Sequence, residues 1–140
     1  MAKLTSKKVE GDFRRFLIDS DLAKGLSGQV YRNGMRPRDS RKEDAVVIFT
    51  SGLPDEIQTG VITINIYVPD LDGNGTGVFE QDGQRLEEIE RAAQDWVESL
   101  TANRSCYRIS LRQSIHTMEE PEINQHFVVV KLGYSYFDGE

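Results

Sequence analysis

The sequence has a single cysteine, Cys106, so it cannot form an internal disulfide, and that residue alone cannot build a zinc site. No segment approaches the roughly 18 consecutive apolar residues that a membrane-spanning helix requires. Residues 1–13 contain lysines but no apolar run behind them, unlike a secretory signal peptide. From these absences we expect an intracellular protein with no membrane partner.

The composition is typical of a soluble globular domain, with 38% hydrophobic and 29% charged residues in a chain of 140. The charge is uneven. Residues 1–44 hold 11 Lys/Arg and 7 Asp/Glu, net +4, whereas residues 45–140 hold 6 and 16, net −10. A net charge of −6 argues against specific nucleic-acid binding. A basic segment beside an acidic body suits contacts between copies of the chain, although an ordinary mixed surface explains the same charges.

Residues 86–100 carry the strongest periodic signal in the chain. Apolar side chains recur at three- and four-residue steps, opposite a face of glutamates and other polar residues. This spacing predicts an amphipathic helix, with Asp82 as its candidate N-cap. The apolar stripe, which includes the only tryptophan, consists of Leu86, Ile89, Ala93, Trp96, Val97 and Leu100.

A second, shorter helix is predicted from Asp12, its candidate N-cap, to the stop signal at Gly25, after a flexible arm at 1–10. Alternating apolar residues then predict strands at 27–32, 45–50, 58–69, 106–116 and 125–137. We expect 45–50 and 58–69 to pair as one hairpin. The last two strands should form another hairpin around a turn at 117–124.

The apolar pattern also fixes which side chains share a face of the second hairpin. Tyr107, Ile109, Leu111 and Ile115 should lie with Val128, Val130, Leu132, Tyr134 and Tyr136. The reverse, semi-polar face should then carry Arg108, Ser110, Arg112, Ser114, His116 and Lys131.

Together these elements predict a single α+β domain over residues 1–140. Its core would be a single-layer, mostly antiparallel sheet of two long hairpins plus a short strand, packed against two amphipathic helices. A basic loop at 33–44 and a glycine-rich loop at 69–83 connect the elements.

The glycine-rich loop contains the nearest match to a metal site. Read as a twelve-residue calcium loop, 70–81 places Asp70, Asp72, Asn74 and Thr76 at alternate ligand positions, with Gly75 at the bend. Against this, position 12 is Gln81 instead of glutamate, and a strand ending in Pro69 precedes the loop instead of a helix. Turn-forming residues in a solvated loop explain the same sequence without calcium. A calcium-dependent protein-binding module that uses residues 70–81 is therefore the alternative function and not the main one.

The remaining chemistry-bearing residues predict no catalytic site and no cofactor. His126 should lie on the apolar side of its strand and His116 on the other, so the two cannot easily share a metal ion. Cys106 at a strand start is better explained as a small packed residue than as a nucleophile. The chain has no phosphate-binding Gly-rich motif, no serine elbow and no HExxH, so we expect a non-enzymatic protein.

Charged residues that could contact another protein fall in two groups. The 33–44 loop is rich in arginine, which binds carboxylates bidentately and would suit the acidic body of a neighbouring copy. A solvated loop is the alternative explanation. The candidate interface residues are Arg36, Arg38, Arg41 and Lys42 in the loop, and Arg108, Arg112 and Lys131 on the semi-polar sheet face.

Several strings in the sequence carry a family resemblance. They are GQVYRNGMRP at 28–37, EDAVV at 43–47 and NIYVPD at 65–70, followed by the glycine-rich loop, the amphipathic helix and the C-terminal hairpin. In this order the chain resembles the tail-terminator proteins, also called tail-completion or minor tail proteins, of long-tailed bacteriophages and prophages, particularly those of gut Bacteroidetes.

The resemblance implies a structural protein of the virion tail, assembled in the cytoplasm of the bacterial host. Such proteins form rings, typically hexamers, that cap the tail tube, end its polymerisation and present the head-joining surface. The implied partners are further copies of the chain, the major tail-tube protein and a head-completion protein. The family has no motif that defines the ring interface, so the interface residues above come from charge and expected exposure alone.

Overall fold

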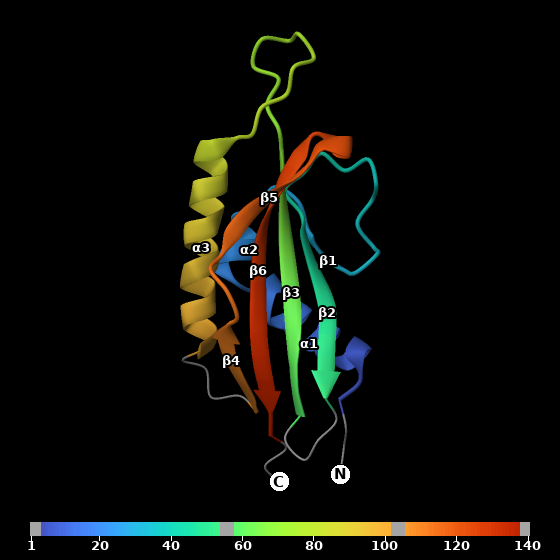
Figure 1. The fold of residues 1–140 in the computed structure, drawn as a ribbon, viewed down its shortest axis with the longest axis vertical. Helices are drawn as coiled ribbons and strands as arrows, with labels where there is room; N and C mark the ends of the chain where they lie inside the picture. Colours follow the sequence, from blue (N-terminus) through green and yellow to red (C-terminus); the bar gives the residue numbers. More distant parts are fainter. Residues whose placement is uncertain (1–3, 54–57, 102–105, 138–140) are drawn as a thin grey trace.

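The computed structural model describes residues 4–53, 58–101 and 106–137. It contains one mixed six-stranded sheet and three α-helices in these residues, which confirms the predicted α+β class (Figure 1). In chain order the elements are α1 (Ser6–Ile18), α2 (Asp21–Lys24), β1 (Val30–Arg32), β2 (Ala45–Leu53), β3 (Gln58–Pro69), α3 (Gly83–Thr101), β4 (Tyr107–Leu111), β5 (His116–Glu120), the 3₁₀ turn η1 (Pro121–Ile123) and β6 (Gln125–Tyr136).

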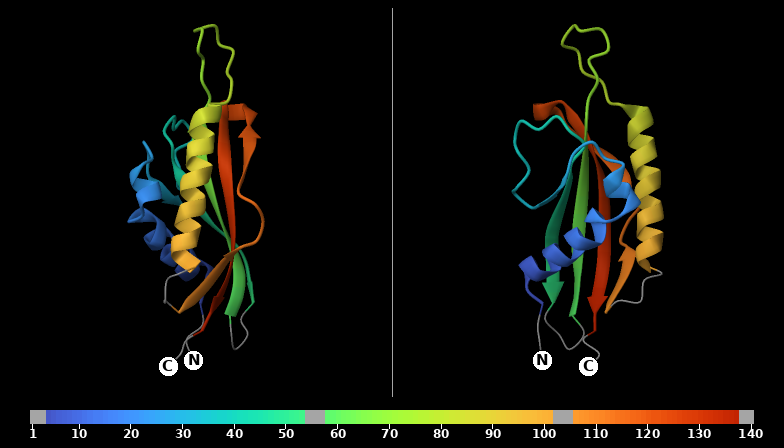
Figure 2. Two further views of the ribbon diagram at one scale, coloured as in Figure 1. Left: turned by 90° about the vertical axis from the view of Figure 1, so that its left-hand side faces the viewer. Right: turned by 180° about the vertical axis from the view of Figure 1, so that it is seen from behind.

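The sheet has strand order β1-β2-β3-β6-β4, and β5 also pairs with β6. Only the β1–β2 pair is parallel, so the sheet is mostly antiparallel, as the sequence predicts. Helices α1 and α3 both lie on one face of the sheet (Figure 2). No helix of the described chain covers the opposite face, which we call the open face.

Helix α3 confirms the central prediction. All six residues of the apolar stripe are buried, and they join the single core cluster with the inward side chains of the sheet. The backbone N–H of Arg85 donates to the Asp82 carboxylate at 3.2 Å, so Asp82 does cap the helix. The stripe therefore provides the apolar surface that closes this side of the core.

The first helix begins earlier than predicted. Thr5, not Asp12, is the N-cap of α1, and Asp12 lies buried in the middle of the helix. The flexible arm predicted at 1–10 is therefore wrong from Ser6 onward, because Val9 packs into the core with 1% of its surface exposed. The start was misplaced because lysines dominate the first turn and only Val9 marks its inward face. The chain then begins a separate short helix, α2, which is capped by Ser20 and ends at Gly25 as predicted.

The hairpin of β2 and β3 is confirmed, with Val47 opposite Ile64 and Ala45 opposite Ile66. The inward residues Ile62, Ile64 and Ile66 are fully buried against the helices. Strand β2 continues three residues past the predicted end at Thr50, after a bulge between Phe49 and Ser51.

The second hairpin differs from the prediction. Its first arm is divided into β4 and β5, which both pair with β6. Four residues separate Leu111 from His116, whereas only two separate their partners Leu132 and Val129. The predicted turn at 117–124 is therefore wrong for residues 117–120, which form β5. Because the excess is two residues, side-chain alternation is preserved, and Tyr107 and Ile109 pair with Tyr136 and Tyr134 on the core side as predicted.

Candidate functional site: the open sheet face and two loops

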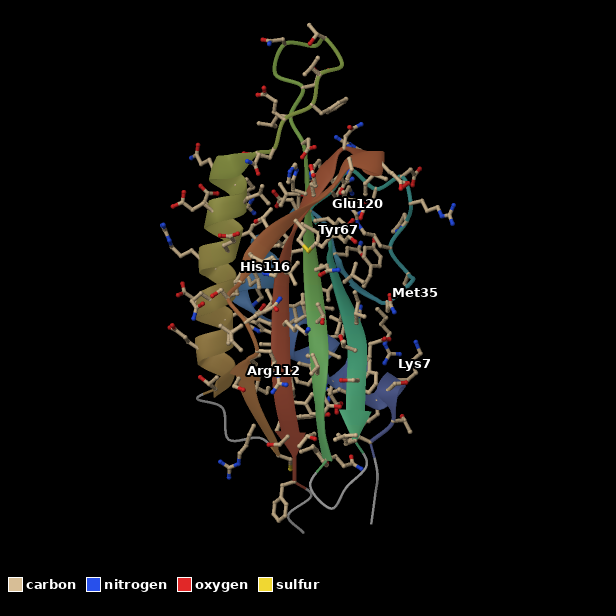
Figure 3. The ribbon with its side chains drawn as sticks, in the orientation of Figure 1. Lys7, Met35, Tyr67, Arg112, His116 and Glu120 are labelled. Atoms are coloured by element: carbon tan, nitrogen blue, oxygen red, sulfur yellow. The ribbon has the colours of Figure 1, made fainter. Side chains whose placement is uncertain are left out.

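The open face carries the alternate residues of each strand, those that point away from the helices. Near its centre and upper half, Figure 3 shows Tyr67, His116 and Glu120 on this side of the sheet. The tyrosine and Phe127 rings pack with their centroids 5.2 Å apart, and Met118 of β5 lies opposite Phe127. Met118 is 49% exposed, so this aromatic and sulfur-containing surface lies at the solvent boundary.

Two valines show how apolar this face is. Val46 and Val129 are buried by neighbouring side chains, yet both lie outside the core cluster on the helix side. Burial raises the pKa of Tyr67, although the nearby Arg36 partly opposes that effect. An uncovered sheet face with apolar content of this kind is typical of a protein-binding surface.

The lower half of the open face is hollowed. A cavity of about 560 Å³ lies between the ends of β2, β3, β6 and β4, and we call it the arginine hollow. Its lining combines two arginines with small, polar and apolar residues: Ser51, Gly52, Leu53, Thr59, Gly60, Val61, Arg108, Ile109, Ser110, Arg112, Gly133, Tyr134 and Ser135. The Arg112 side chain lies directly over Gly133, which has no Cβ to displace it.

The structure brings together the three basic residues predicted for the semi-polar face. Arg108 pairs with Ser135 in the ladder, and the backbone N–H of Arg112 donates to the Lys131 carbonyl at 2.9 Å. Arg108 and Arg112 are exposed, and neither guanidinium makes an ion pair or hydrogen bond within the described residues. Their charge is therefore available to an anionic partner, and their place in an interface stays a prediction.

Arg36 corrects the prediction for the 33–44 loop. Its guanidinium donates to the Asp44 carboxylate at 2.9 Å and to the Gln125 side chain at 2.9 Å, and it lies 4.2 Å above the Tyr67 ring. Only 10% of the Arg36 side chain is exposed. Arg36 is therefore an internal anchor of the loop and is not free to contact a neighbouring molecule.

The other three basic residues of that loop divide into two kinds. Arg41 is exposed but donates to the Ile123 carbonyl at 2.8 Å, and to the Asp70 carbonyl at 3.5 Å, so it ties the loop to the upper end of the sheet. Arg38 and Lys42 are exposed, and their side chains have no partner among the residues that the structure describes. Of the four candidate residues in this loop, only Arg38 and Lys42 therefore remain available for charged contacts with another protein.

The glycine-rich loop does not have the arrangement of a calcium site. Asp70 accepts a 2.7 Å hydrogen bond from the His126 ring. Both carboxylate oxygens of Asp72 accept backbone N–H groups of the same loop, from Thr76 at 3.0 Å and Gly77 at 2.9 Å. The two aspartates thus face different partners. Within the described ranges, no three His, Cys, Asp or Glu side chains gather as a metal site.

The same contacts give the loop a defined shape. Leu71 and Glu80 exchange backbone hydrogen bonds of 2.7 and 2.9 Å, which closes its base, and Gly75 and Gly77 adopt the positive φ angles that its tight bend requires. The loop projects beyond the end of the sheet and of α3 (Figure 1). Its apolar side chains are exposed, with Leu71 at 52% and Val78 at 66%.

Two further networks were not predicted from the sequence. Buried Asp12 accepts hydrogen bonds from Lys8 at 2.9 Å, Arg15 at 2.8 Å and the Tyr107 hydroxyl at 2.7 Å. Burial acts to raise the pKa of Asp12, but these three donors outweigh it and hold the pKa below its ordinary value. Burial, followed by the bond to Asp12, raises the pKa of Tyr107.

The second network joins helix α3 to the end of the 33–44 loop. Arg85 donates to both oxygens of Glu43, at 2.7 and 2.8 Å, and to the Gly25 carbonyl at 2.7 Å. The pKa of Arg85 is raised, chiefly by the hydrogen bonds that it donates to the Glu43 carboxylate. The sequence places Arg85 off the apolar stripe of α3. It gives no signal that Glu43, 42 residues away, is the partner of Arg85.

Comparisons with known proteins place the chain in no family. No family model matches it, and no curated protein matches it. Several chains of solved structures are similar, and one of them shares 19% sequence identity over 98% of this chain and 99% of its own, with a TM-score of 0.43. Among the described residues, no helix is long and apolar enough to cross a membrane.

Proposed function

We propose that this protein is a structural, non-enzymatic tail terminator of a long-tailed phage or prophage. It would assemble as a ring of copies, six if it follows the resemblance, that caps the tail tube and ends its polymerisation. The major tail-tube protein would bind one side of the ring and a head-completion protein the other. The protein would then belong to the virion tail and assemble in the host cytoplasm.

The observation that carries this proposal is the open face of the sheet. Helices α1 and α3 cover only the other face, so the sheet presents Tyr67, Phe127 and Met118 toward one end and the unpaired charges of Arg108 and Arg112 toward the other. A face that combines an exposed aromatic and apolar group with uncompensated arginines has the composition of a protein interface. The sequence strings described above supply the family and hence the identity of the partners.

The structure changes which residues we assign to the interface. Arg108, Arg112 and Lys131 remain, because they lie together on the open face. Arg38 and Lys42 remain as exposed loop charges. Arg36 and Arg41 instead hold the 33–44 loop against the sheet. They would affect an interface indirectly, by fixing the conformation of this loop.

Electron microscopy of the protein with its tail-tube protein tests the proposal. We expect shorter tubes of more uniform length, each with added density at one end, and free tubes of scattered length when the protein is absent. The double variant Arg108→Glu/Arg112→Glu should leave tubes uncapped while keeping the native circular dichroism spectrum.

Lys24→Glu is the matched control, because Lys24 is an exposed residue of α2 on the helix side of the sheet. It should cap tubes as the unmodified protein does. Tubes whose lengths and ends are unaffected by the unmodified protein would overturn the proposal.

A further inference from the structure

The glycine-rich loop and the arginine hollow have complementary chemistry at opposite ends of the molecule. Residues 71–82 contain Asp72, Glu80 and Asp82 and no lysine or arginine. The hollow contains Arg108 and Arg112 and no aspartate or glutamate. One is therefore acidic and the other basic, so the two are electrostatically complementary.

The loop also carries apolar side chains that are exposed to solvent. Leu71, Val78 and Phe79 are 52%, 66% and 38% exposed, and all three lie on the projecting loop. Exposed apolar residues on a projecting loop indicate a contact with another molecule. The hollow offers a surface for them, since its lining includes glycines together with Val61 and Leu53.

The loop is built in a fixed shape. Asp72 accepts two backbone N–H groups across the bend, and the Leu71–Glu80 bridge closes its base. Arg41 lies 5.7 Å from the Phe79 ring and donates to the Asp70 carbonyl, which steadies the loop where it leaves the sheet. A segment already held in one conformation loses little conformational freedom when it binds.

We propose that this loop, residues 71–80, docks into the arginine hollow of a second copy of the same chain. The loop extends past one end of the sheet, whereas the hollow lies near the other end, on the open face (Figures 1 and 3). A copy therefore cannot fill its own hollow. Each copy offers one loop and one hollow, so the contact is heterologous and repeats from copy to copy until a ring closes.

This inference rests on the proposed function, for which it names the contact that joins one subunit of the ring to the next. Photo-cross-linking tests it directly. A benzoylphenylalanine at Val78 should cross-link to peptides containing 108–112 or 133–135 in a second copy, with mixed light and heavy isotope-labelled chains showing that the link is between copies. The experiment is run on the full chain, both alone at high concentration and together with the tail-tube protein.

Met35 provides the matched probe position. Met35 is 67% exposed and Val78 is 66% exposed, but Met35 lies on the basic 33–44 loop. A probe at Met35 should not reach the hollow peptides. If the Val78 probe cross-links elsewhere, or to no other copy under either condition, or if the Met35 probe gives the same products, the docking contact is wrong.

Complementary variants provide a second test. Val78→Ser/Phe79→Ser damages only the loop, and Arg108→Glu/Arg112→Glu damages only the hollow, so each should be monomeric by native mass spectrometry. A mixture of the two retains one intact loop and one intact hollow and should give heterodimers that grow no further. Rings formed by either variant alone would overturn the contact.

The outcomes separate the two proposals. Capped tubes with cross-links outside the hollow would leave the tail function standing and remove the docking contact. Cross-links to the hollow without any effect on tubes would keep the contact and remove the tail function.

Discussion

The Arg36 guanidinium and the Asp44 carboxylate form a 2.9 Å ion pair beneath the 33–44 loop, with 10% and 1% of the two side chains exposed. Asp44 also accepts the backbone N–H of Gln29 at 2.9 Å and the Ser40 hydroxyl. The pair thus joins the basic loop, the strand before it and, through Gln125, the start of β6. This buried ion pair therefore stabilises a segment whose sequence is typical of a solvated loop.

Arg36→Ala should therefore destabilise the fold. Removing one partner of a buried pair leaves the other charge uncompensated, which costs about 3–5 kcal/mol. We expect a loss of this order in the free energy of unfolding measured with urea. Arg38→Ala, two residues away and exposed, should change it by less than about 0.5 kcal/mol. Equal effects of the two variants would show that Arg36 is not the anchor described here.

The contrast between these two arginines shows where sequence reasoning stops. The apolar stripe of α3 and the alternating isoleucines of β3 are local patterns, and the structure confirms both. Arg36 and Arg38 are the same residue type in the same loop. What distinguishes them is the set of partners of Arg36, which includes Asp44 and, 89 residues away in the sequence, Gln125. Long-range polar partners of this kind leave no periodic signal.

The division of the second hairpin was missed for a similar reason. Residues 112–115 contain no glycine or proline to mark the interruption between β4 and β5. The polar run 117–120 reads as a turn, yet it becomes β5 because the long strand β6 offers unpaired backbone groups along its edge. The correct faces were still predicted, because the irregularity adds an even number of residues.

The Asp12–Tyr107 contact predicts a dependence of stability on pH at both ends of the scale. The pKa of Asp12 is held below its ordinary 3.8 in the folded protein, so its contribution is fully present above that value and is lost as pH falls through the folded-state pKa. The pKa of Tyr107 is raised above its ordinary 10.0, so its contribution is present below that value and is lost as pH rises.

Tyr107→Phe should reduce both effects. Without the hydroxyl, Asp12 keeps only Lys8 and Arg15 as side-chain donors, and a buried carboxylate oxygen that loses its donor costs about 1–3 kcal/mol near neutral pH. The alkaline loss of stability should shrink without vanishing, because burial raises the pKa of Tyr134 and of Tyr67 as well.

Urea unfolding at a series of pH values measures both limbs. Tyr31→Phe is the control, since the Tyr31 hydroxyl makes no hydrogen bond within the described residues. A Tyr107→Phe profile that coincides with the unmodified one would remove the proposed coupling between α1 and β4.

Gly60 should tolerate no side chain. A Cβ there would overlap the backbone carbonyl oxygen of Ser51 and the Tyr134 hydroxyl, so β2 and β3 would have to separate. Gly60→Ala should lower the free energy of unfolding by about 1–3 kcal/mol or more, as overpacking does. Gly83→Ala is the matched change in open space at the start of α3 and should be neutral or stabilising by up to about 1 kcal/mol. Thermal melting of the two variants makes the comparison.

Calcium should have no effect on this protein, despite the spacing of residues 70–81. The two carboxylate oxygens of Asp72 already accept the N–H groups of Thr76 and Gly77, and Asp70 is joined to His126. A cation would have to replace these bonds and reorient both aspartates toward one centre, because calcium takes six to eight oxygen ligands at about 2.3–2.6 Å. Isothermal titration with calcium at about millimolar concentration, where even weak extracellular modules bind, should give no saturable heat.

The same arrangement predicts what Asp72 does in place of binding an ion. Asp72→Ala removes the acceptor of two N–H groups and should loosen the bend, which increases the rate at which a protease cuts between residues 72 and 79. Asn74→Ala is the control, because the Asn74 side chain makes no hydrogen bond within the described residues. Adding calcium or a chelator should leave both cleavage rates unchanged. If calcium slowed cleavage of the unmodified loop but not of the Asp72→Ala variant, the carboxylate would be a metal ligand and the loop would have to be reinterpreted as an ion site.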